Sequence, residues 1–165
     1  ELFQLLHAHG IPCLVCSAGF TAIIEEVFRR ENIPTELVHI RANDMLFAED
    51  GSLAGFGDPM ITSVNKGLLG QWDAEYFRGA ERKCVLLAGD SLRDPDCLQS
   101  IEGVDQAIRV GFYDSRAKPG QAAEYERTYD VVFSNEGLPL EQDLDMGPLI
   151  DLLGQVLVDS GSSAA

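Results

Sequence analysis

Residues 84–95 run Cys-Val-Leu-Leu-Ala-Gly-Asp-Ser-Leu-Arg-Asp-Pro, and this stretch decides the fold class. Its first five residues form a continuous apolar run, which is typical of a strand buried on both faces of a parallel sheet. The glycine and acidic residues that follow predict a polar loop at the carboxyl end of that strand. Ligands of open parallel sheets bind at the carboxyl ends of the strands. We therefore look for chemistry in the residues directly after each apolar run.

The rest of the chain alternates short apolar runs with amphipathic segments in the same way. Apolar runs predict strands at residues 13–16, 37–40, 84–88, 107–110 and 131–133, and a hairpin from the pair 45–47 and 53–56. Helical spacing of apolar residues predicts helices at 2–9, 20–28, 73–80, 117–127 and 146–157. This alternation indicates an α/β fold with a parallel sheet covered on both faces. We expect one domain over residues 1–158 and a disordered tail at 159–165.

Composition and net charge argue against some classes of binding partner. The 165 residues are 45% hydrophobic and 24% charged, which is typical of a globular protein. No apolar run approaches the ~20 residues that a membrane-spanning helix needs. The 12 basic and 27 acidic residues give a net charge of −15, and such a field repels nucleic acid and acidic membrane surfaces. We therefore expect neither a nucleic acid polymer nor a membrane as a partner.

The cysteines do not have the pattern of a disulfide framework. Cys13 and Cys16 lie three residues apart on an expected strand, where this offset places two side chains on opposite faces. Cys84 opens another apolar run, and Cys97 lies in an expected helix. We expect four reduced, mostly buried thiols, as in a cytoplasmic protein.

Ser17, Ala18 and Gly19 follow the first expected strand and precede a helix. A hydroxyl group and backbone N–H groups at the start of a helix can bind an anion. The alternative is that Ser17 only caps the helix or forms a serine turn. The residues alone leave both interpretations open.

Asp90 and Asp94 lie four residues apart in the loop after residues 84–88. Two carboxylates in such a loop suit a hard cation such as Mg²⁺, which prefers oxygen ligands. Alternatively, Asp94 followed by Pro95 fits a helix N-cap with proline at the first helical position, which explains Asp94 without a metal but leaves Asp90 unexplained. Two further polar residues are ambiguous by themselves: Lys66 fits a solvated surface lysine, and Asn43 fits either a turn or a polar ligand contact.

Taken in order, Ser17, Lys66, Asp90 and Asp94 resemble the second, third and fourth motifs of the haloacid dehalogenase superfamily of phosphatases. The match is closer to the cytosolic pyrimidine 5′-nucleotidase family, and it is carried by residues 11–19, 24–27, 43–47, 51–56, 64–66, 86–91, 108–112 and 129–132. This resemblance covers roughly residues 2–157. It implies a haloacid-dehalogenase-like doubly wound parallel sheet, which is a Rossmann-like three-layer α/β fold.

The resemblance also implies a reaction and a role for each matched residue. The reaction is the Mg²⁺-dependent hydrolysis of a nucleoside 5′-monophosphate, with pyrimidines preferred, through an aspartyl-phosphate intermediate. Ser17 and the N–H group of Ala18 would hold phosphate oxygens, and Lys66 would offset the charge of the nucleophile and the phosphoryl group. Asp90 would bind Mg²⁺, and Asp94 would orient the site or bind the metal indirectly.

One departure from the family pattern is large. The first motif of the family, Asp-x-Asp-x-Thr, supplies the nucleophile and the general acid, and it does not occur in these 165 residues. We expect it upstream of Glu1 together with most of the cap, so that the sheet is incomplete without the nucleophile strand and this chain alone is inactive. A smaller departure is Arg93, which stands where the family often has glycine and would place a positive charge beside the metal loop.

Two other interpretations stay open. The chain would then belong to another haloacid-dehalogenase-type phosphomonoesterase that acts on a small phosphorylated metabolite, or to a truncated, non-catalytic paralogue that only binds. The sequence indicates no oligomeric state.

Overall fold

The structure is a computed structural model that describes residues 1–78 and 83–162. The chain divides into two units, Glu1–Thr62 with Met146–Ala165 and Ser63–Asp145. Each unit contains its own parallel sheet, and the first unit also carries an antiparallel hairpin. The expected mixed α/β class with parallel strands is therefore confirmed. None of the described helices has the length and apolar character that a membrane span requires.

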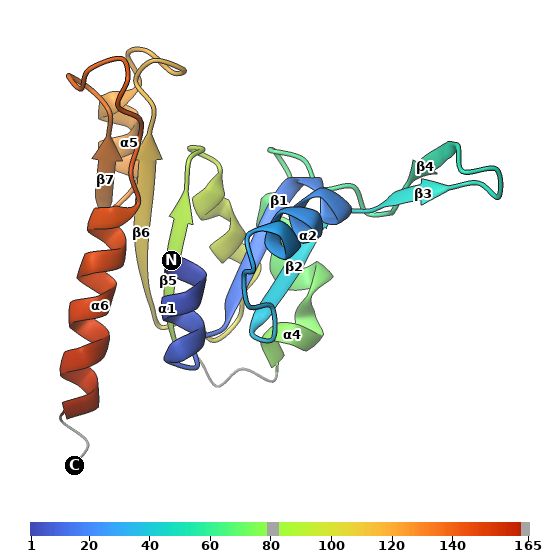
Figure 1. The fold of residues 1–165 in the computed structure, drawn as a ribbon, viewed down its shortest axis with the longest axis horizontal. Helices are drawn as coiled ribbons and strands as arrows, with labels where there is room; N and C mark the ends of the chain where they lie inside the picture. The colour runs from blue at the N-terminus through green and yellow to red at the C-terminus, as the bar shows by residue number, and fades with distance from the viewer. Residues whose placement is uncertain (79–82, 163–165) are drawn as a thin grey trace. The chain divides into compact units, whose positions relative to one another are not determined.

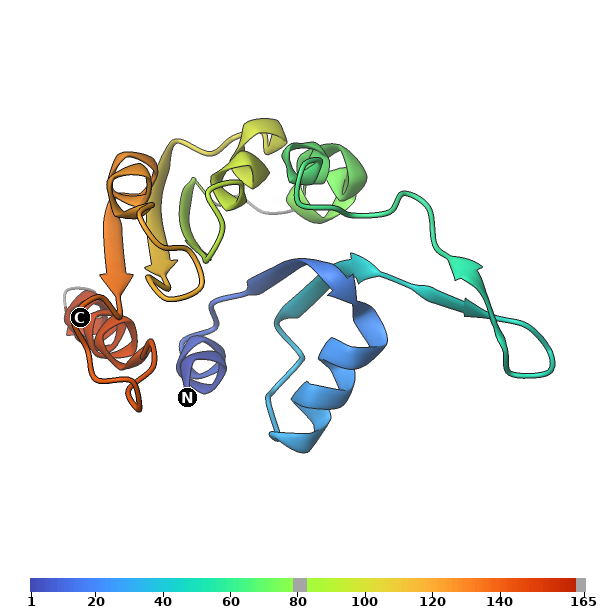
Figure 2. The same ribbon diagram turned by 90° about the horizontal axis from the view of Figure 1, so that it is seen from above.

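The first unit is built on two parallel strands, β1 (Cys13–Phe20) and β2 (Val38–Asn43). Its helices are α1 (Leu2–Ala8), α2 (Thr21–Arg30) and α6 (Gly147–Ser162). Helix α2 connects the two strands and lies along one face of the pair (Figure 2). Phe28 anchors it, because this side chain is buried and its ring meets that of Phe3 edge-on at 4.9 Å.

A shift of register interrupts the pairing of β1 with β2. Cys16 lies opposite Arg41, whereas Phe20 lies opposite Asn43, so β1 contains more residues than β2 over this interval. The extra residues form a bulge at Ser17–Gly19, and bulges release backbone groups from the ladder. The loop in which the sequence predicts an anion site is therefore a bulge inside β1.

The hairpin lies where the sequence predicts it. Its strands are β3 (Met45–Phe47) and β4 (Leu53–Phe56), which pair antiparallel. The side chain of Asp50 accepts hydrogen bonds from the backbone N–H and the hydroxyl of Ser52, and Gly51 takes a positive φ of 82°. The hydrogen bonds and backbone conformation of these turn residues thus determine which residues of β3 and β4 pair.

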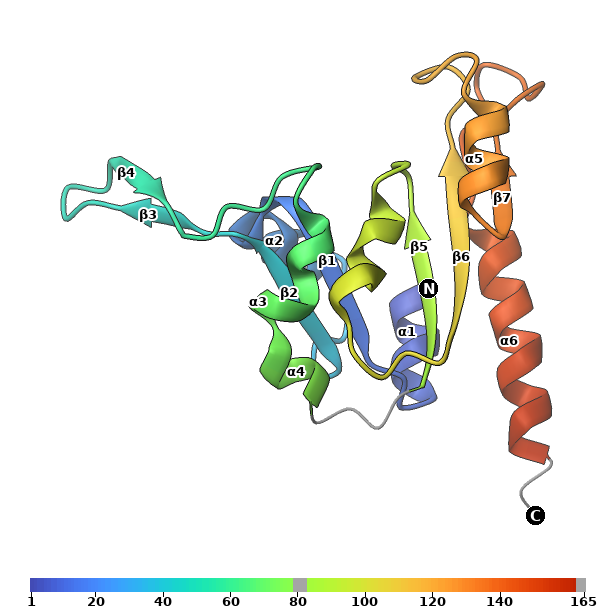
Figure 3. The same ribbon diagram turned by 180° about the vertical axis from the view of Figure 1, so that it is seen from behind.

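The second unit is built on three parallel strands in the order β5 (Cys84–Gly89), β6 (Gln106–Tyr113) and β7 (Val131–Ser134), which lie side by side in Figure 1. Its helical elements are η1 (Lys66–Leu68), α3 (Leu69–Trp72), α4 (Ala74–Arg78), η2 (Asp94–Ser100) and α5 (Ala122–Thr128). Helix α5 packs against β6 and β7, and η2 follows β5 (Figure 3).

Three tyrosines form the core beneath the carboxyl ends of β5 and β6. The ring of Tyr125 lies 4.9 Å from that of Tyr113 and 5.7 Å from that of Tyr129, and all three side chains are buried. A Cβ atom at Gly111 would lie 2.6 Å from the ring of Tyr129, so only glycine admits this close approach.

Two expectations about the helix bounds need correction. Helix α5 begins at Ala122 rather than at 117, because Pro119 and the positive φ of Gly120 hold residues 117–121 in a loop. The helix expected at 73–80 is confirmed as α4 (Ala74–Arg78), and residues 79–80 lie outside the described ranges. Helix α6 continues to Ser162, four residues into the tail expected to be disordered, whereas 163–165 are not described.

The expectation for the cysteines holds in part. All four are free thiols, as predicted, but Cys97 is buried whereas Cys84 is exposed and the other two are half-buried. The expectation of mostly buried thiols is therefore wrong. Burial raises the pKa of the Cys13 thiol, which keeps it protonated and unreactive.

Candidate active site

Asp94 and Lys66 form a closed ion pair in the second unit. The Nζ atom of Lys66 lies 2.6 Å from Oδ1 of Asp94, and the two side chains are only 14% and 10% exposed. Lys66 begins the short helix η1 and Asp94 begins η2, so two packed helical turns hold the pair. The interpretation of Lys66 as a solvated surface lysine is therefore wrong.

Asp94 is also bonded to the loop that precedes it. Its Oδ2 atom accepts the N–H of Ser91 at 2.9 Å, and a Cβ atom at Gly89 would lie 2.4 Å from the same oxygen. The glycine at the end of β5 is thus required for the approach of the carboxylate. Arg93, rather than Asp94, is the N-cap of η2, so the N-cap interpretation of Asp94 is also wrong.

The Asp90–Ser91 backbone is held from the tyrosine core. The hydroxyl groups of Tyr125 and Tyr129 donate hydrogen bonds to the carbonyl oxygens of Asp90 and Ser91, respectively. These bonds leave the side chain of Asp90 free of the core, and it is 81% exposed. Burial, together with the negative charge of Asp94, raises the pKa of Tyr129, so this phenol remains a donor.

Lys118 is a site residue that the sequence analysis missed. Its ammonium group donates a hydrogen bond to the carbonyl oxygen of Asp90 and lies 3.4 Å from the carboxylate oxygen Oδ2 of the same residue. Burial lowers its pKa, but the bond to Tyr125 and the charge of Asp90 outweigh burial and leave the pKa raised. No local signal marks it, because Asp90 lies 28 residues away in the chain.

The carboxylate oxygens of this loop could bind a hard cation from one side only. Asp90 presents an exposed carboxylate at the carboxyl end of β5, whereas the carboxylate of Asp94 is already committed to Lys66 and Ser91. Among the described residues no group of three or more potential metal ligands occurs. The carboxylate of Asp90 is an oxygen donor of the kind that Mg²⁺ prefers, and it lies 3.4 Å from the ammonium group of Lys118. Arg93 is turned to Asp96, at 3.6 Å.

In the first unit, Ser17 and Ala18 lie in the bulge of β1. The Oγ atom of Ser17 accepts the N–H of Gly19 at 3.0 Å, which is the geometry of a serine turn. Phe20 is the N-cap of α2, so Ser17 does not cap the helix. Ala18 is exposed and Ser17 is half-buried, and the hydroxyl of Ser17 keeps its own proton to donate.

Asn43, at the end of β2, is bonded to this bulge. Its side-chain amide donates to the carbonyl oxygens of Ala18 and Ile61, both at 2.9 Å, and its Oδ1 accepts the N–H of Ile61 at 2.6 Å. Asn43 is 3% exposed. It is neither a simple turn residue nor an exposed contact for a ligand, because its polar atoms are bonded to backbone.

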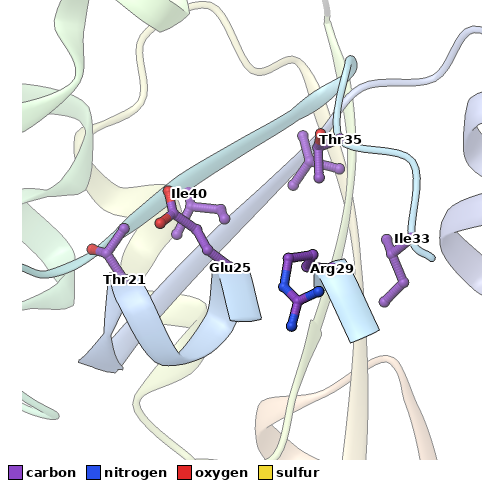
Figure 4. A pocket seen from close by; sticks show the side chains of 7 residues that line it. Thr21, Glu25, Arg29, Ile33, Thr35 and Ile40 are labelled. Atoms are coloured by element: carbon purple, nitrogen blue, oxygen red, sulfur yellow. The ribbon is translucent and has the colours of Figure 1, made fainter. Parts of the chain in front are cut away.

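A separate, open pocket of about 490 Å³ lies between α2 and β2 (Figure 4). Thr21, Glu25 and Arg29 line it from the helix and Ile40 from the strand. The guanidinium group of Arg29 is paired with Glu26 at 2.8 Å. None of the predicted site residues lines this pocket.

The chain is similar to known proteins over most of its length. The 7-methylguanosine phosphate-specific 5′-nucleotidase of Homo sapiens is 31% identical over 156 residues, which are 94% of this chain and 49% of that protein. The enzyme of the same name from Drosophila melanogaster is 30% identical over 138 residues, 82% of this chain and 43% of its own length. The chain thus spans about half the length of these curated relatives.

The fold itself matches a solved structure. The crystal structure of cytosolic 5′-nucleotidase IIIB bound to cytidine aligns with 96% of this chain and 52% of its own, at a TM-score of 0.77 and 27% sequence identity. The family model for pyrimidine 5′-nucleotidase (UMPH-1) matches residues 1–144. Because that match includes both the β1 bulge and the β5 loop, the chain belongs to the pyrimidine 5′-nucleotidase (UMPH-1) family.

Proposed function

We propose that this chain is the phosphate- and metal-binding part of a Mg²⁺-dependent 5′-nucleotidase, which converts a nucleoside 5′-monophosphate to nucleoside and phosphate. The observation that carries the proposal is the buried ion pair of Lys66 and Asp94 beside the loop of Asp90. A lysine that is nearly closed to solvent and held by one carboxylate is a fixed positive charge. Fixed charges of this kind stabilise a transferring phosphoryl group.

In this proposal each predicted site residue has one task. The hydroxyl of Ser17 and the N–H of Ala18 donate hydrogen bonds to phosphate oxygens. Lys66 offsets the negative charge of the nucleophile and of the phosphoryl group, and Asp94 orients Lys66. Asp90 would hold Mg²⁺, which when bound supplies Lewis-acid stabilisation of phosphate charge.

The nucleophile of the proposal is an aspartate that these 165 residues do not contain, since Asp-x-Asp-x-Thr is absent from them. It attacks phosphorus, the nucleoside oxygen leaves, and water then hydrolyses the aspartyl-phosphate. Within the second unit, β5 pairs with a single strand among the described residues, which leaves its other edge open to a further strand. The incomplete doubly wound sheet and the missing cap are part of the same proposal.

Two substrate classes have support. The family name and the cytidine-bound structure favour pyrimidine nucleotides, whereas the names of the curated relatives favour 7-methylguanosine phosphate. We retain the pyrimidine monophosphates as the first choice and treat 7-methylguanosine 5′-monophosphate as the second. A cytoplasmic location agrees with the name of the structural relative, and the net charge of −15 disfavours a nucleic acid polymer as partner.

The test is phosphate release by the full-length protein that contains these residues, with Mg²⁺ and each of CMP, UMP, GMP and 7-methylguanosine 5′-monophosphate. We expect turnover of at least one nucleotide, and loss of turnover in Lys66→Met. Hydrolysis of small sugar phosphates but of no nucleotide would favour another phosphomonoesterase of the superfamily. Phosphate binding without any turnover would favour a non-catalytic paralogue.

A further inference from the structure

Asn43 is a buried side chain whose hydrogen bonds converge on the bulge of β1. It lies opposite Phe20 in the register, directly after the residues that leave the ladder. Its amide nitrogen has two donors, and both are used, on the carbonyl oxygens of Ala18 and Ile61. Its amide oxygen accepts the N–H of Ile61, which fixes which end of the amide is nitrogen.

These bonds determine the path of the bulge. The carbonyl group of Ala18 points to Asn43, and the N–H of the same peptide unit, which belongs to Gly19, points to the hydroxyl oxygen of Ser17. Both ends of that peptide unit are therefore bonded, so its plane cannot turn without the loss of a hydrogen bond. The peptide plane in turn sets where the Ser17 hydroxyl and the Ala18 N–H lie.

We propose that Asn43 is a positioning residue for phosphate binding, which holds the Ser17–Gly19 bulge in the form that presents the Ser17 hydroxyl and the Ala18 N–H to a phosphate oxygen. This inference rests on the proposed function. It requires asparagine, because an aspartate at 43 has no donor for the two carbonyl groups and would place a negative charge beside them. Shorter side chains with a single hydroxyl can serve only one of the partners.

Asn135 provides a matched control in the other unit. It is 2% exposed, and its amide accepts the N–H and the hydroxyl of Ser115 and donates to Asp114. It resembles Asn43 in burial and in the number of its bonds, but none of those bonds reaches the Ser17 bulge. Removing either side chain leaves backbone groups unbonded, so a general loss of stability is expected from both.

The structural experiment measures amide hydrogen exchange in the full-length protein that contains these residues. Asn43→Ser is expected to speed exchange at Gly19 about tenfold or more and to leave Ser115 unchanged, whereas Asn135→Ala is expected to do the reverse. The functional arm measures inhibition of the full-length protein by inorganic phosphate. Asn43→Ser and Asn43→Asp are expected to weaken inhibition about tenfold, as a misaligned hydrogen bond to a charged group does, and Asn135→Ala is expected to leave it unchanged.

Ser17→Ala separates this inference from the proposed function. If Ser17→Ala leaves phosphate inhibition intact, the proposed phosphate site itself is wrong. If Ser17→Ala weakens inhibition but the Asn43 variants do not, the positioning role alone is wrong. Equal exchange at Gly19 in wild type and Asn43→Ser also overturns it. If Asn43→Asp fails to fold, Asn43→Ser carries the test.

Discussion

Lys66 and Asp94 stand 28 residues apart in the chain, yet Nζ and Oδ1 meet at 2.6 Å in a place almost closed to solvent. An ion pair in such surroundings has little net effect on stability while it is intact, but the loss of one partner leaves a buried charge without compensation. The pair therefore links the stability of the second unit to the residue that is proposed to act in catalysis.

Lys66→Met is expected to lower both activity and stability. Turnover by the full-length protein should fall about 100-fold, because a preorganised charge is worth on the order of 3 kcal/mol. The free energy of unfolding should fall by about 3 kcal/mol, because Asp94 is left unpaired. Urea denaturation measures the second effect. The double variant Lys66→Met/Asp94→Asn should recover part of the stability but none of the activity. If its loss of stability equals the sum of the losses in the two single variants, the pairing is contradicted.

Asp90→Asn and Asp94→Asn should separate metal binding from stability. The side chain of Asp90 is 81% exposed, so Asp90→Asn should weaken Mg²⁺ binding while the urea midpoint stays unchanged. Asp94→Asn should do the opposite, because it breaks a buried pair. Mg²⁺ titration of activity, alongside denaturation of the same samples, checks the order. A larger metal effect in Asp94→Asn would show that the two roles are reversed.

Gly89→Ala should disturb the site through crowding alone. The added Cβ would lie 2.4 Å from the carboxylate of Asp94, and overpacking of this kind costs about 1–3 kcal/mol. Gly55→Ala is the matched control, since Gly55 also lies in a strand and nothing lies within 4 Å of its would-be Cβ. Thermal denaturation of both variants tests the contact. Equal melting temperatures would mean that Asp94 lies elsewhere.

Tyr125→Phe should loosen the loop of Asp90 without removing any ligand. The variant keeps the ring in the core but deletes the hydroxyl that donates to the Asp90 carbonyl, at a cost of about 1 kcal/mol. We expect weaker Mg²⁺ binding with kcat at saturating Mg²⁺ nearly unchanged. Thr128→Val is the control, because that hydroxyl donates to the carbonyl oxygen of Glu124 within α5 and not to the loop. The idea fails if both variants change Mg²⁺ affinity equally.

Arg109 and Asp130 predict a pH dependence of stability. Hydrogen bonds from Arg109 lower the pKa of Asp130 to about 2. A pKa below the unfolded value of about 3.9 means that this pair stabilises the folded chain above about pH 4 and ceases to do so as the pH falls through about 2. Asp130→Asn should therefore lower the urea midpoint at pH 6, and this difference should disappear towards pH 2. Because the pair is exposed, the difference should also shrink in high salt.

The parts of the fold that depend on local pattern were predictable from the sequence. The hairpin follows from its turn residues, and β5 with its acidic loop follows from one apolar run and the glycine after it. The error at α5 is of the same local kind. Pro119 and Gly120 were present in the sequence, but the amphipathic spacing from Ala117 was given more weight than the two breakers.

The contacts of the site were less predictable, because they join residues far apart in the chain. Lys66 has no local feature that sets it apart; the family resemblance suggested its role, and its pairing with Asp94 is visible only in the structure. Asn43 was singled out by its place after a strand, but its partners Ala18 and Ile61 lie 25 and 18 residues away. No sequence feature near Lys118 marks it as a residue of the candidate site. Pattern predicts which elements form, whereas tertiary packing decides which side chains meet.

The tyrosine core contacts residues 90 and 91 through hydrogen bonds to their backbone carbonyl oxygens and not to their side chains. Every amino acid has the same carbonyl group, so these two hydrogen bonds do not depend on which side chains occupy the two positions. A substitution at position 90 therefore changes the side-chain group that we propose to bind Mg²⁺, and its contact with Lys118, but it keeps the two hydrogen bonds that the tyrosines donate to the backbone.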